Sequence, residues 1–343
     1  MKTSVTLTFT GLFLSVAAAY WYYGSPLPKP ETPAISGKGS LKLLDLDKEA
    51  ITLIQIQNME TKEVVTFERL PARLAEASAA RAGEWRLKYP VNYLADKMMI
   101  EGLSLALRVS TKARRLVREK GWEEYGLLKP KLKIGIEAKG LSKRKYLLLG
   151  DTSPVAALIF ARWEGEEDYF LLDARFKESF DRSLYSLREK KIIRFPLADL
   201  KKIHVRPFSA LARRNEAGTA GEPAENFELT QEKGAWFWTE PVVRLGKPVP
   251  KEQVYEILMV LRELYAKEFL DGEPVRETER GFSLAGPYIQ VWDKHEKTST
   301  VRFGSEAPGH DAYYGLIDGE DVVLEIARGN VQKFFELFDV KSE

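Results

Sequence analysis

Few residues of this chain have types and spacings that could do chemistry. His310 and Asp311 are adjacent and could form an acid–base pair. Asp151 and Asp173 could serve as the two carboxylates of a glycoside-cleaving site. Each also has a plainer interpretation, namely a solvated histidine in a loop, a turn cap at Asp151 and a strand end at Asp173. We favour the plainer interpretations and predict no catalytic residues.

Familiar catalytic and cofactor-binding motifs are also missing from the sequence. The 343 residues include no cysteine and three histidines, which excludes thiol chemistry and leaves little room for a histidine-rich metal site. The sequence has no Walker pattern and no Gly-x-Ser-x-Gly elbow, and His295-Glu296 is not followed by the second histidine of a zinc protease. We therefore predict a protein that is not an enzyme, with no cofactor and no metal. An enzyme acting on envelope polymer is the minor alternative.

The chain begins with one long apolar segment, which precedes the part that holds the candidate residues. Residues 4–23 carry no charge, and about 20 such residues can span a bilayer as a helix. The segment ends in a run of aromatic residues that suits the headgroup region: Tyr20, Trp21, Tyr22 and Tyr23. We predict a transmembrane anchor over residues 1–23, in contact with membrane lipid. A cleaved signal peptide is the main alternative, with Ala17-Ala18-Ala19 as its cleavage site, and both place the body outside the cytoplasm. A buried N-terminal helix is the third alternative. Residues 24–40, rich in Pro and Gly, read as a tether.

Charge is distributed unevenly along the body of the chain. Residues 108–146 contain 13 Lys or Arg and 4 Glu, whereas residues 221–343 contain 14 basic and 24 acidic residues. These stretches are either two solvated faces or contact surfaces. The candidate contacts to an anionic lipid, polysaccharide or protein are Lys112, Arg114, Arg115, Arg118, Lys143, Arg144 and Lys145. The basic region of one copy and the acidic region of another could also bind each other head to tail. We expect no nucleic-acid partner, because no recognisable nucleic-acid motif is present.

The sequence contains an ordered internal repeat. Four landmarks of the first half recur in the same order in the second: Trp85-x-x-x-x-Pro90 as Trp236-x-x-x-x-Pro241, Tyr125-Gly126-Leu127 as Phe282-Ser283-Leu284, Gly150-Asp151 as Gly304-Ser305, and Gly165-Glu166 as Gly319-Glu320. Four ordered matches favour duplication over chance. We predict two modules, a basic one over residues 41–197 and an acidic one over residues 198–343.

Apolar periodicity predicts the same elements in both modules. The expected strands are 51–56, 64–67, 132–136, 146–149, 157–162 and 169–172 in the first, and 203–208, 227–230, 288–292, 300–303, 313–317 and 322–326 in the second. A main helix capped by Asn92 and another beginning at Pro250 follow the Trp–Pro landmarks, and a short helix closes each module, near 177–187 and 331–338. The fold class is therefore α+β: an N-terminal transmembrane helix, then two tandem copies of a strand-rich module with one main helix packed on antiparallel strands.

These residues together resemble a bacterial family called domain of unknown function 4340. The motifs that carry the resemblance are the span ending in tyrosines, Leu43-Leu44-Asp45-Leu46-Asp47, Trp85-x-Leu87-x-x-Pro90, Ala95-Asp96, Tyr125-Gly126-Leu127, Leu148-Leu149-Gly150-Asp151 and Asp181-Arg182. The second module departs from the pattern at Phe237-Trp238 and Ser305. The resemblance implies a membrane-anchored extracytoplasmic protein with a duplicated module, often encoded near auxiliary subunits of ABC transporters of the gliding-motility type. It implies no catalytic residues.

The anchor, the duplication and the missing catalytic set favour a binding function. We expect a non-enzymatic accessory or scaffold subunit on the periplasmic side of the bacterial cytoplasmic membrane. Its expected partner is a membrane protein complex, such as an ABC permease or its auxiliary subunit. The alternative is an extracytoplasmic binder of anionic envelope glycan or lipid.

Overall fold

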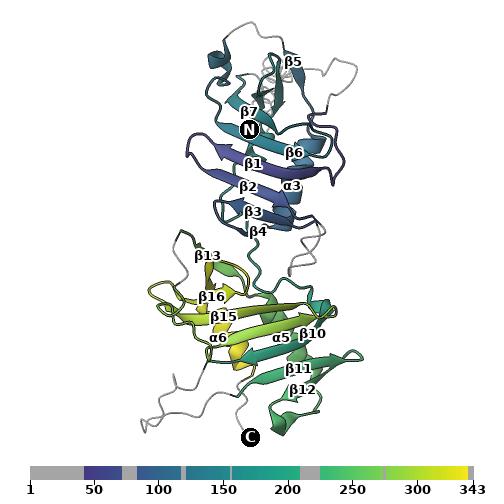
Figure 1. Cartoon of the computed structure of the whole chain (residues 1–343), viewed down its shortest axis with the longest axis vertical. Helices are drawn as coiled ribbons and strands as arrows, with labels where there is room; N and C mark the ends of the chain where they lie inside the picture. The colour runs from purple at the N-terminus through teal and green to yellow at the C-terminus, as the bar shows by residue number, and fades with distance from the viewer. Residues whose placement is uncertain are drawn as a thin grey trace, which may run out of the picture.

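The computed structural model describes residues 42–71, 83–116, 121–154, 157–208, 225–272 and 276–338. Within them the chain forms two antiparallel sheets with few helices, so the fold is strand-rich (Figure 1). We call the parts that hold the first and second sheets module 1 and module 2. No helix in these ranges is long and apolar enough to cross a membrane. The predicted anchor and tether lie outside them.

The first sheet has nine strands in the order β4-β3-β2-β1-β6-β7-β8-β9-β5. Their bounds are β1 Ile51–Asn58, β2 Val64–Arg69, β3 Trp85–Tyr89, β4 Tyr93–Leu94, β5 Arg114–Leu116, β6 Leu132–Ala138, β7 Lys145–Thr152, β8 Leu158–Trp163 and β9 Tyr169–Asp173. All neighbouring strands run antiparallel. β5, at one edge, comes from the chain just after the main helix and pairs with β9.

The second sheet has eight strands in the order β12-β11-β10-β14-β15-β16-β17-β13. Their bounds are β10 Leu200–Arg206, β11 Phe227–Glu232, β12 Ala235–Glu240, β13 Ala266–Leu270, β14 Tyr288–Asp293, β15 Thr298–Ala307, β16 Ala312–Ile317 and β17 Val323–Ala327. Apart from β4, which has no counterpart, each strand of the first sheet has an equivalent at the same place in the second. Irregularities recur too: the β7–β8 pairing shifts register between Leu149 and Thr152, and the β15–β16 pairing between Phe303 and Glu306. This agreement supports the predicted repeat.

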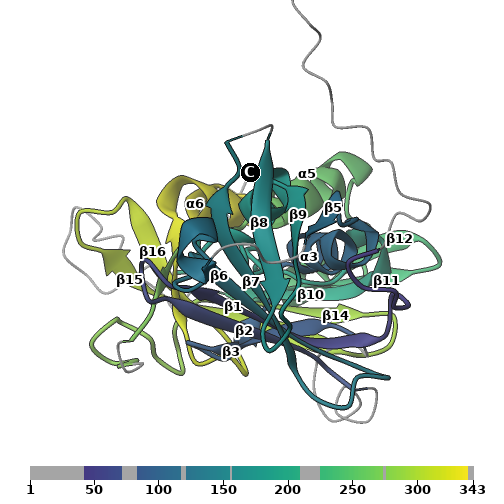
Figure 2. The ribbon, with the colours of Figure 1, turned by 90° about the horizontal axis from the view of Figure 1, so that it is seen from above.

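The helices lie on one face of each sheet. Module 1 has α3 Lys97–Val109 and α4 Arg175–Phe180, and module 2 has α5 Lys251–Arg262 and α6 Arg328–Glu336. Short 3₁₀ turns are η1 Trp122–Tyr125, η2 Leu197–Asp199 and η4 Val242–Arg244. Figure 2 shows α3, α5 and α6 on one side of the molecule, opposite β1, β2, β3 and β14. Inward residues of α3, such as Leu103 and Leu107, join the same buried cluster as Ile54 and Ile56 of β1. The core of module 1 is therefore formed by the inward side of α3 and the inward face of β1.

Two close glycine contacts recur in both modules, and they correct one predicted landmark: the counterpart of Gly126 is Gly281, not Ser283. Gly126 and Gly281 both have positive φ. A Cβ on Gly126 would lie within 3 Å of Asp151, and a Cβ on Gly281 would lie within 3 Å of Ser305. A Cβ on Gly150 would lie 2.1 Å from the Tyr125 carbonyl oxygen, and one on Gly304 would lie 2.2 Å from the Arg280 carbonyl oxygen. In both modules a connecting segment therefore crosses the strand too closely for any side chain.

Several predicted elements need correction. The Trp85 and Trp236 landmarks are strands, β3 and β12, and β5 and β13 are also strands that the periodicity did not predict. Asn92 does not cap α3: its side chain accepts a hydrogen bond from Arg86, and Asp96 is the cap, with its Oδ1 accepting from the Met99 amide at 3.0 Å. Residue 93 starts β4 instead, which places an extra strand between the landmark and the helix. Pro250 precedes the first turn of α5 rather than occupying it.

Candidate functional site

The chain passes from module 1 to module 2 in a short crossing segment, residues 187–192. Leu187 is buried in the core of module 1, whereas Ile192 is buried in the core of module 2. Between them, Lys191 forms an antiparallel bridge with Tyr265, and the Lys190 carbonyl accepts from the Ala266 amide at 2.8 Å. Because Ala266 begins β13, the edge strand of the second sheet, the crossing segment pairs with that edge. The two modules are thus joined through main-chain hydrogen bonds as well as by covalent connection.

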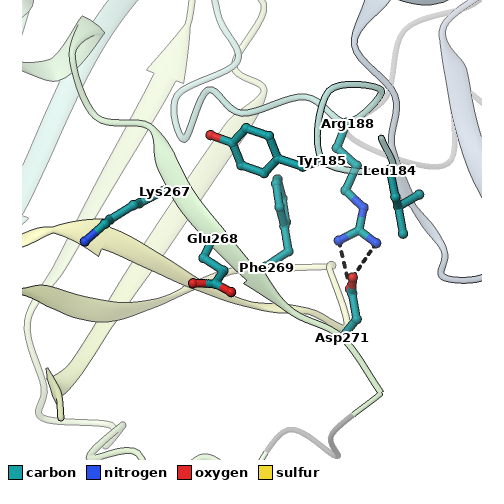
Figure 3. A pocket seen from close by; sticks show the side chains of 7 residues that line it. All are labelled: Leu184, Tyr185, Arg188, Lys267, Glu268, Phe269 and Asp271. Atoms are coloured by element: carbon teal, nitrogen blue, oxygen red, sulfur yellow. Dashed lines mark hydrogen bonds and ion pairs between the residues drawn. The ribbon is translucent and has the colours of Figure 1, made fainter. Parts of the chain in front are cut away.

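A buried ion pair lies beside this crossing. Arg188 has only 1% of its side chain exposed, and its two terminal nitrogens bind the two carboxylate oxygens of Asp271 at 2.8 and 2.6 Å (Figure 3). The guanidinium carbon also lies 4.7 Å from the ring centroid of Phe269. A planar guanidinium matched to a carboxylate in this way is among the strongest polar contacts in proteins. It joins the crossing segment to the residue that follows β13.

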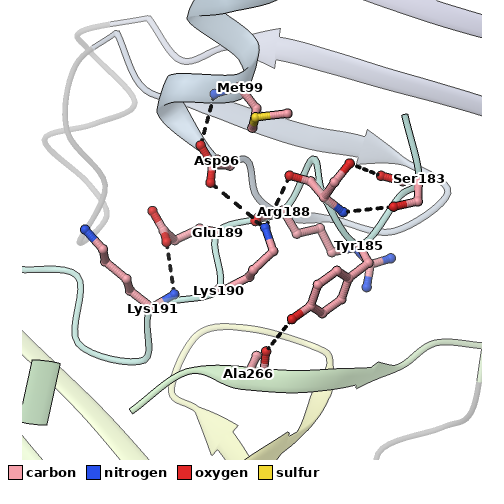
Figure 4. A network of polar contacts seen from close by, with 10 residues as sticks. Asp96, Met99, Ser183, Tyr185, Arg188, Glu189, Lys190, Lys191 and Ala266 are labelled. Atoms are coloured by element: carbon pink, nitrogen blue, oxygen red, sulfur yellow. Dashed lines mark hydrogen bonds and ion pairs between the residues drawn. The ribbon is translucent and has the colours of Figure 1, made fainter. Parts of the chain in front are cut away.

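The polar contacts continue from this pair to the start of α3 (Figure 4). The Asp96 amide donates to the Leu187 carbonyl at 3.0 Å, while its carboxylate caps α3 and lies 4.0 Å from Lys190. Lys190 donates to the carbonyl of Arg188 at 3.0 Å. From the other side, the Tyr185 hydroxyl donates to the Ala266 carbonyl at 3.2 Å. Helix α3 and strand β13 are therefore fixed to the same short segment.

A second buried charge cluster joins the modules. Glu320, in the turn between β16 and β17, has 3% of its side chain exposed and accepts from Arg86 of β3 and from Arg194. Arg194 also lies over the ring of Tyr93, at 5.0 Å from its centroid. Tyr93 belongs to β4 of module 1, yet it packs in the core of module 2 and against Phe269. Burial raises the pKa of Tyr93, and the positive charge of Arg194 opposes that rise.

A pocket of about 370 Å³ opens beside the Arg188–Asp271 pair (Figure 3). Its lining comes from the crossing region and from β13: Leu184, Tyr185, Arg188, Lys267, Glu268, Phe269 and Asp271. Phe269 and Leu184 give it an apolar wall, Tyr185 adds a second aromatic ring, and the four charged groups supply both signs. Its volume lies at the lower end of the range for small-molecule sites. The arrangement could hold a small polar molecule, with Tyr185 and Phe269 as its aromatic surfaces.

One wall of the pocket borders a second group of titratable side chains. Glu268 lies near His310 and Glu325, and the potential ligand atoms of the three residues are within 4.8 Å of one another. Glu325 is buried on β17, with 2% of its side chain exposed, and both its oxygens lie 2.8 Å from Nδ1 of His310. The histidine therefore supplies the polar partner that a buried carboxylate needs. Neither the ion pairs of the junction nor this group was predicted from the sequence.

The residues considered first for chemistry have separate partners. His310 contacts Glu325, whereas Asp311 binds Arg328 at 2.7 Å, so the two do not form a pair with each other. Asp173 ends β9, as the strand-end interpretation predicts. Its carboxylate binds the Arg175 guanidinium, and this hydrogen bond lowers the pKa of Asp173.

Asp151 does not cap a turn. It lies inside β7, and its carboxylate is 3.2 Å from Lys131. A strand position suits it because the neighbouring Gly126 leaves room for the side chain beside η1.

The predicted anionic-contact residues fall into two groups on different strands. Arg114 and Arg115 lie on β5, at the sheet edge, and Lys112 just before them has its Nζ 4.6 Å from the Phe170 ring centroid. Lys143 is exposed in the turn between β6 and β7, which begins at Lys145. In the sheet order β7-β8-β9-β5, two strands separate the groups.

The second group is largely occupied by acidic partners. Arg144 binds Glu137 at 2.7 Å, and Lys145 lies 3.4 Å from Glu166. Arg118 and the four aromatic residues predicted at the membrane interface lie outside the described residues: Tyr20, Trp21, Tyr22 and Tyr23.

Comparison with known proteins gives one match. The sequence model of a family described as domain of unknown function (DUF4340) matches residues 85–280. No curated protein and no solved structure matches the chain. The matched range starts at β3 and ends before β14, so it contains the crossing segment and both residues of the Arg188–Asp271 pair.

Proposed function

Because the chain belongs to the family described as domain of unknown function (DUF4340), whose description names no activity, we propose its function from its own residues. It is a non-enzymatic scaffold subunit of a membrane protein complex. Residues 4–23 anchor it in the bacterial cytoplasmic membrane as a single helix, and the two modules lie on the extracytoplasmic side. The partner complex is an ABC permease or one of its auxiliary subunits.

The observation that carries this proposal is the junction between the modules. Two sheets of the same order are connected there by a buried bidentate ion pair, by Glu320 between two arginines and by main-chain hydrogen bonds to β13. Separating the modules would expose the ring of Tyr93, which packs in the core of module 2, and would break the ion pair between Arg86 and Glu320. A body of this kind presents two surfaces of different charge at a fixed spacing, which is what a scaffold requires.

The sequence supports the membrane location. The uncharged residues 4–23 have the length of a bilayer-spanning helix, and the tether that follows gives the body some reach. The unequal charge of the two modules supports selective binding, because a basic and an acidic surface steer different partners.

The proposal is tested by purifying the full-length chain from its native membrane in mild detergent, after an alkaline carbonate wash. We expect it to stay in the membrane fraction and to bring an ABC permease, its ATPase or another fixed assembly at constant stoichiometry. Asp271→Ala, which breaks the junction, should reduce the recovered partner, whereas Glu279→Ala on the surface of the same module should not. A chain released by carbonate, or one recovered alone, would contradict the proposal.

A further inference from the structure

Helix α3 exposes apolar side chains along its outer face. Met98, Leu105 and Val109 have 84%, 47% and 58% of their surface exposed, and Gly102, between them, is exposed as well. Their spacing of four, three and four residues puts them in one row on a helix. We call this row the α3 stripe. It is the side opposite the buried residues Ile100, Leu103 and Leu107, so packing within module 1 does not account for it.

The equivalent helix of module 2 shows that the fold does not require this stripe. α5 begins 154 residues after α3, and its buried residues Ile257 and Leu261 match Leu103 and Leu107 at that offset. The same offset places three glutamates and one methionine at the stripe positions: Glu252, Glu256, Met259 and Glu263. The glutamates are exposed. The same helix thus presents an acidic face in one module and an apolar face in the other.

The charged side chains of α3 itself are mainly positive or neutralised. The helix contains one acidic residue, Glu101, which is paired with Lys48 at 3.6 Å and with Arg69 at 3.4 Å. Lys97 at its start and Arg108 in its last turn are its basic residues. An apolar row flanked by basic side chains is the pattern of a helix that lies on an anionic membrane surface.

The chain enters module 1 at the end of this helix. Leu43 donates its amide to the Ser110 carbonyl at 2.7 Å, and Lys42 forms a bridge with Thr111. The tether, residues 24–40, therefore attaches beside the C-terminal end of α3. A segment of 17 residues reaches at most about 60 Å even when fully extended. With residues 4–23 in the bilayer, the α3 stripe is held close to the membrane surface.

We propose that the α3 stripe docks on the surface of a bilayer containing anionic lipid. The inference rests on the proposed membrane anchor and adds a second contact, which fixes the orientation of the body. α5 lies on the same side of the molecule (Figure 2), and anionic lipid repels its glutamates. Module 1 therefore contacts the bilayer lipid, while the acidic helix α5 of module 2 stays off it.

The absence of cysteine from the sequence makes a direct test simple. Single cysteines are introduced in the full-length chain at Met98→Cys or Leu105→Cys, with Glu252→Cys and Met259→Cys as matched controls on α5. Each is labelled with an environment-sensitive fluorophore and reconstituted in vesicles of phosphatidylglycerol and phosphatidylcholine. We expect a blue-shifted emission and severalfold stronger quenching by lipid-borne quencher at positions 98 and 105 than at 252 and 259. Adding Leu105→Glu and Val109→Glu to the position-98 label should abolish both effects, whereas adding Leu128→Glu should not.

Each other outcome refutes a different statement. Equal quenching by aqueous iodide at all four positions would show that the α3 stripe is free, and would overturn the inference. Protection from iodide without quenching from lipid would identify a protein occupant and would also overturn it. Carbonate extraction of the same vesicles separates the two proposals. Release of the chain refutes the anchor, whereas retention with a free α3 stripe refutes the docking alone.

Discussion

Replacing Asp271 by alanine removes the partner of a guanidinium that water cannot reach. Arg188 has 1% of its side chain exposed and binds both Asp271 oxygens. Removing one member of a buried pair costs about 3–5 kcal/mol. Because 34% of the Asp271 side chain is exposed, water can enter the vacated space, and we expect a loss of about 2–3 kcal/mol in the free energy of unfolding.

Urea unfolding of the full-length chain, followed by tryptophan fluorescence, measures this loss. With a slope of about 2–3 kcal/mol per molar urea, the midpoint should fall by about 1 M. Glu279→Ala, which breaks the exposed pair with Arg276, should cost less than about 0.5 kcal/mol. The double variant Arg188→Met with Asp271→Ala should be more stable than Asp271→Ala alone, since it leaves no charge buried. An Asp271→Ala midpoint equal to that of the parent would refute the assigned role of the pair.

Three further predictions concern positions elsewhere in the modules. Gly150→Ala should destabilise module 1, and Gly304→Ala module 2, by about 1–3 kcal/mol each in urea unfolding, because each Cβ meets a carbonyl oxygen. Gly102→Ala, with open space around it, should instead stabilise by about 0.5–1 kcal/mol, and equal effects at all three positions would contradict the close approach. Tyr93→Phe should lessen the loss of stability at alkaline pH. Above the ordinary tyrosine pKa of about 10, the unfolded chain releases a proton that the folded chain keeps, so the parent loses stability as pH rises toward the raised pKa. Urea midpoints that fall equally in both proteins between about pH 9 and 11 would oppose this reasoning. Asp96→Ala should cost about 1 kcal/mol through the lost cap of α3, with Asp45→Ala as the exposed control, and indistinguishable melting temperatures would argue against the cap.

The sheets could be predicted in large part because their pattern is local. Alternating strands such as Ile51–Asn58 and Tyr288–Asp293 bury one face, and that period is visible in the sequence. β3 and β12 were missed because each is followed directly by a proline, which reads as a turn. β13 has two exposed residues in succession, so it lacks the alternating pattern.

The junction could not be predicted because its partners are distant in the sequence. Arg188 and Asp271 are separated by 83 residues, and neither has a local pattern that indicates the other. The repeat identified Gly319-Glu320 as a landmark equivalent to Gly165-Glu166, yet the two glutamates do different things. Glu166 is exposed near Lys145, whereas Glu320 is buried between Arg86 and Arg194. A repeat locates equivalent positions, but burial decides what each side chain does there.

We infer from the junction that the two modules form one rigid body. The most direct test is the distance distribution between spin labels at Glu60→Cys, in an exposed turn of module 1, and at Glu232→Cys, at the exposed end of β11 in module 2. It is measured by double electron–electron resonance in the full-length chain. We expect one narrow distribution in the parent and a broad one once Asp271→Ala is added. A broad distribution in the parent itself would contradict it, because the modules would then move independently and could not present their surfaces at a fixed spacing.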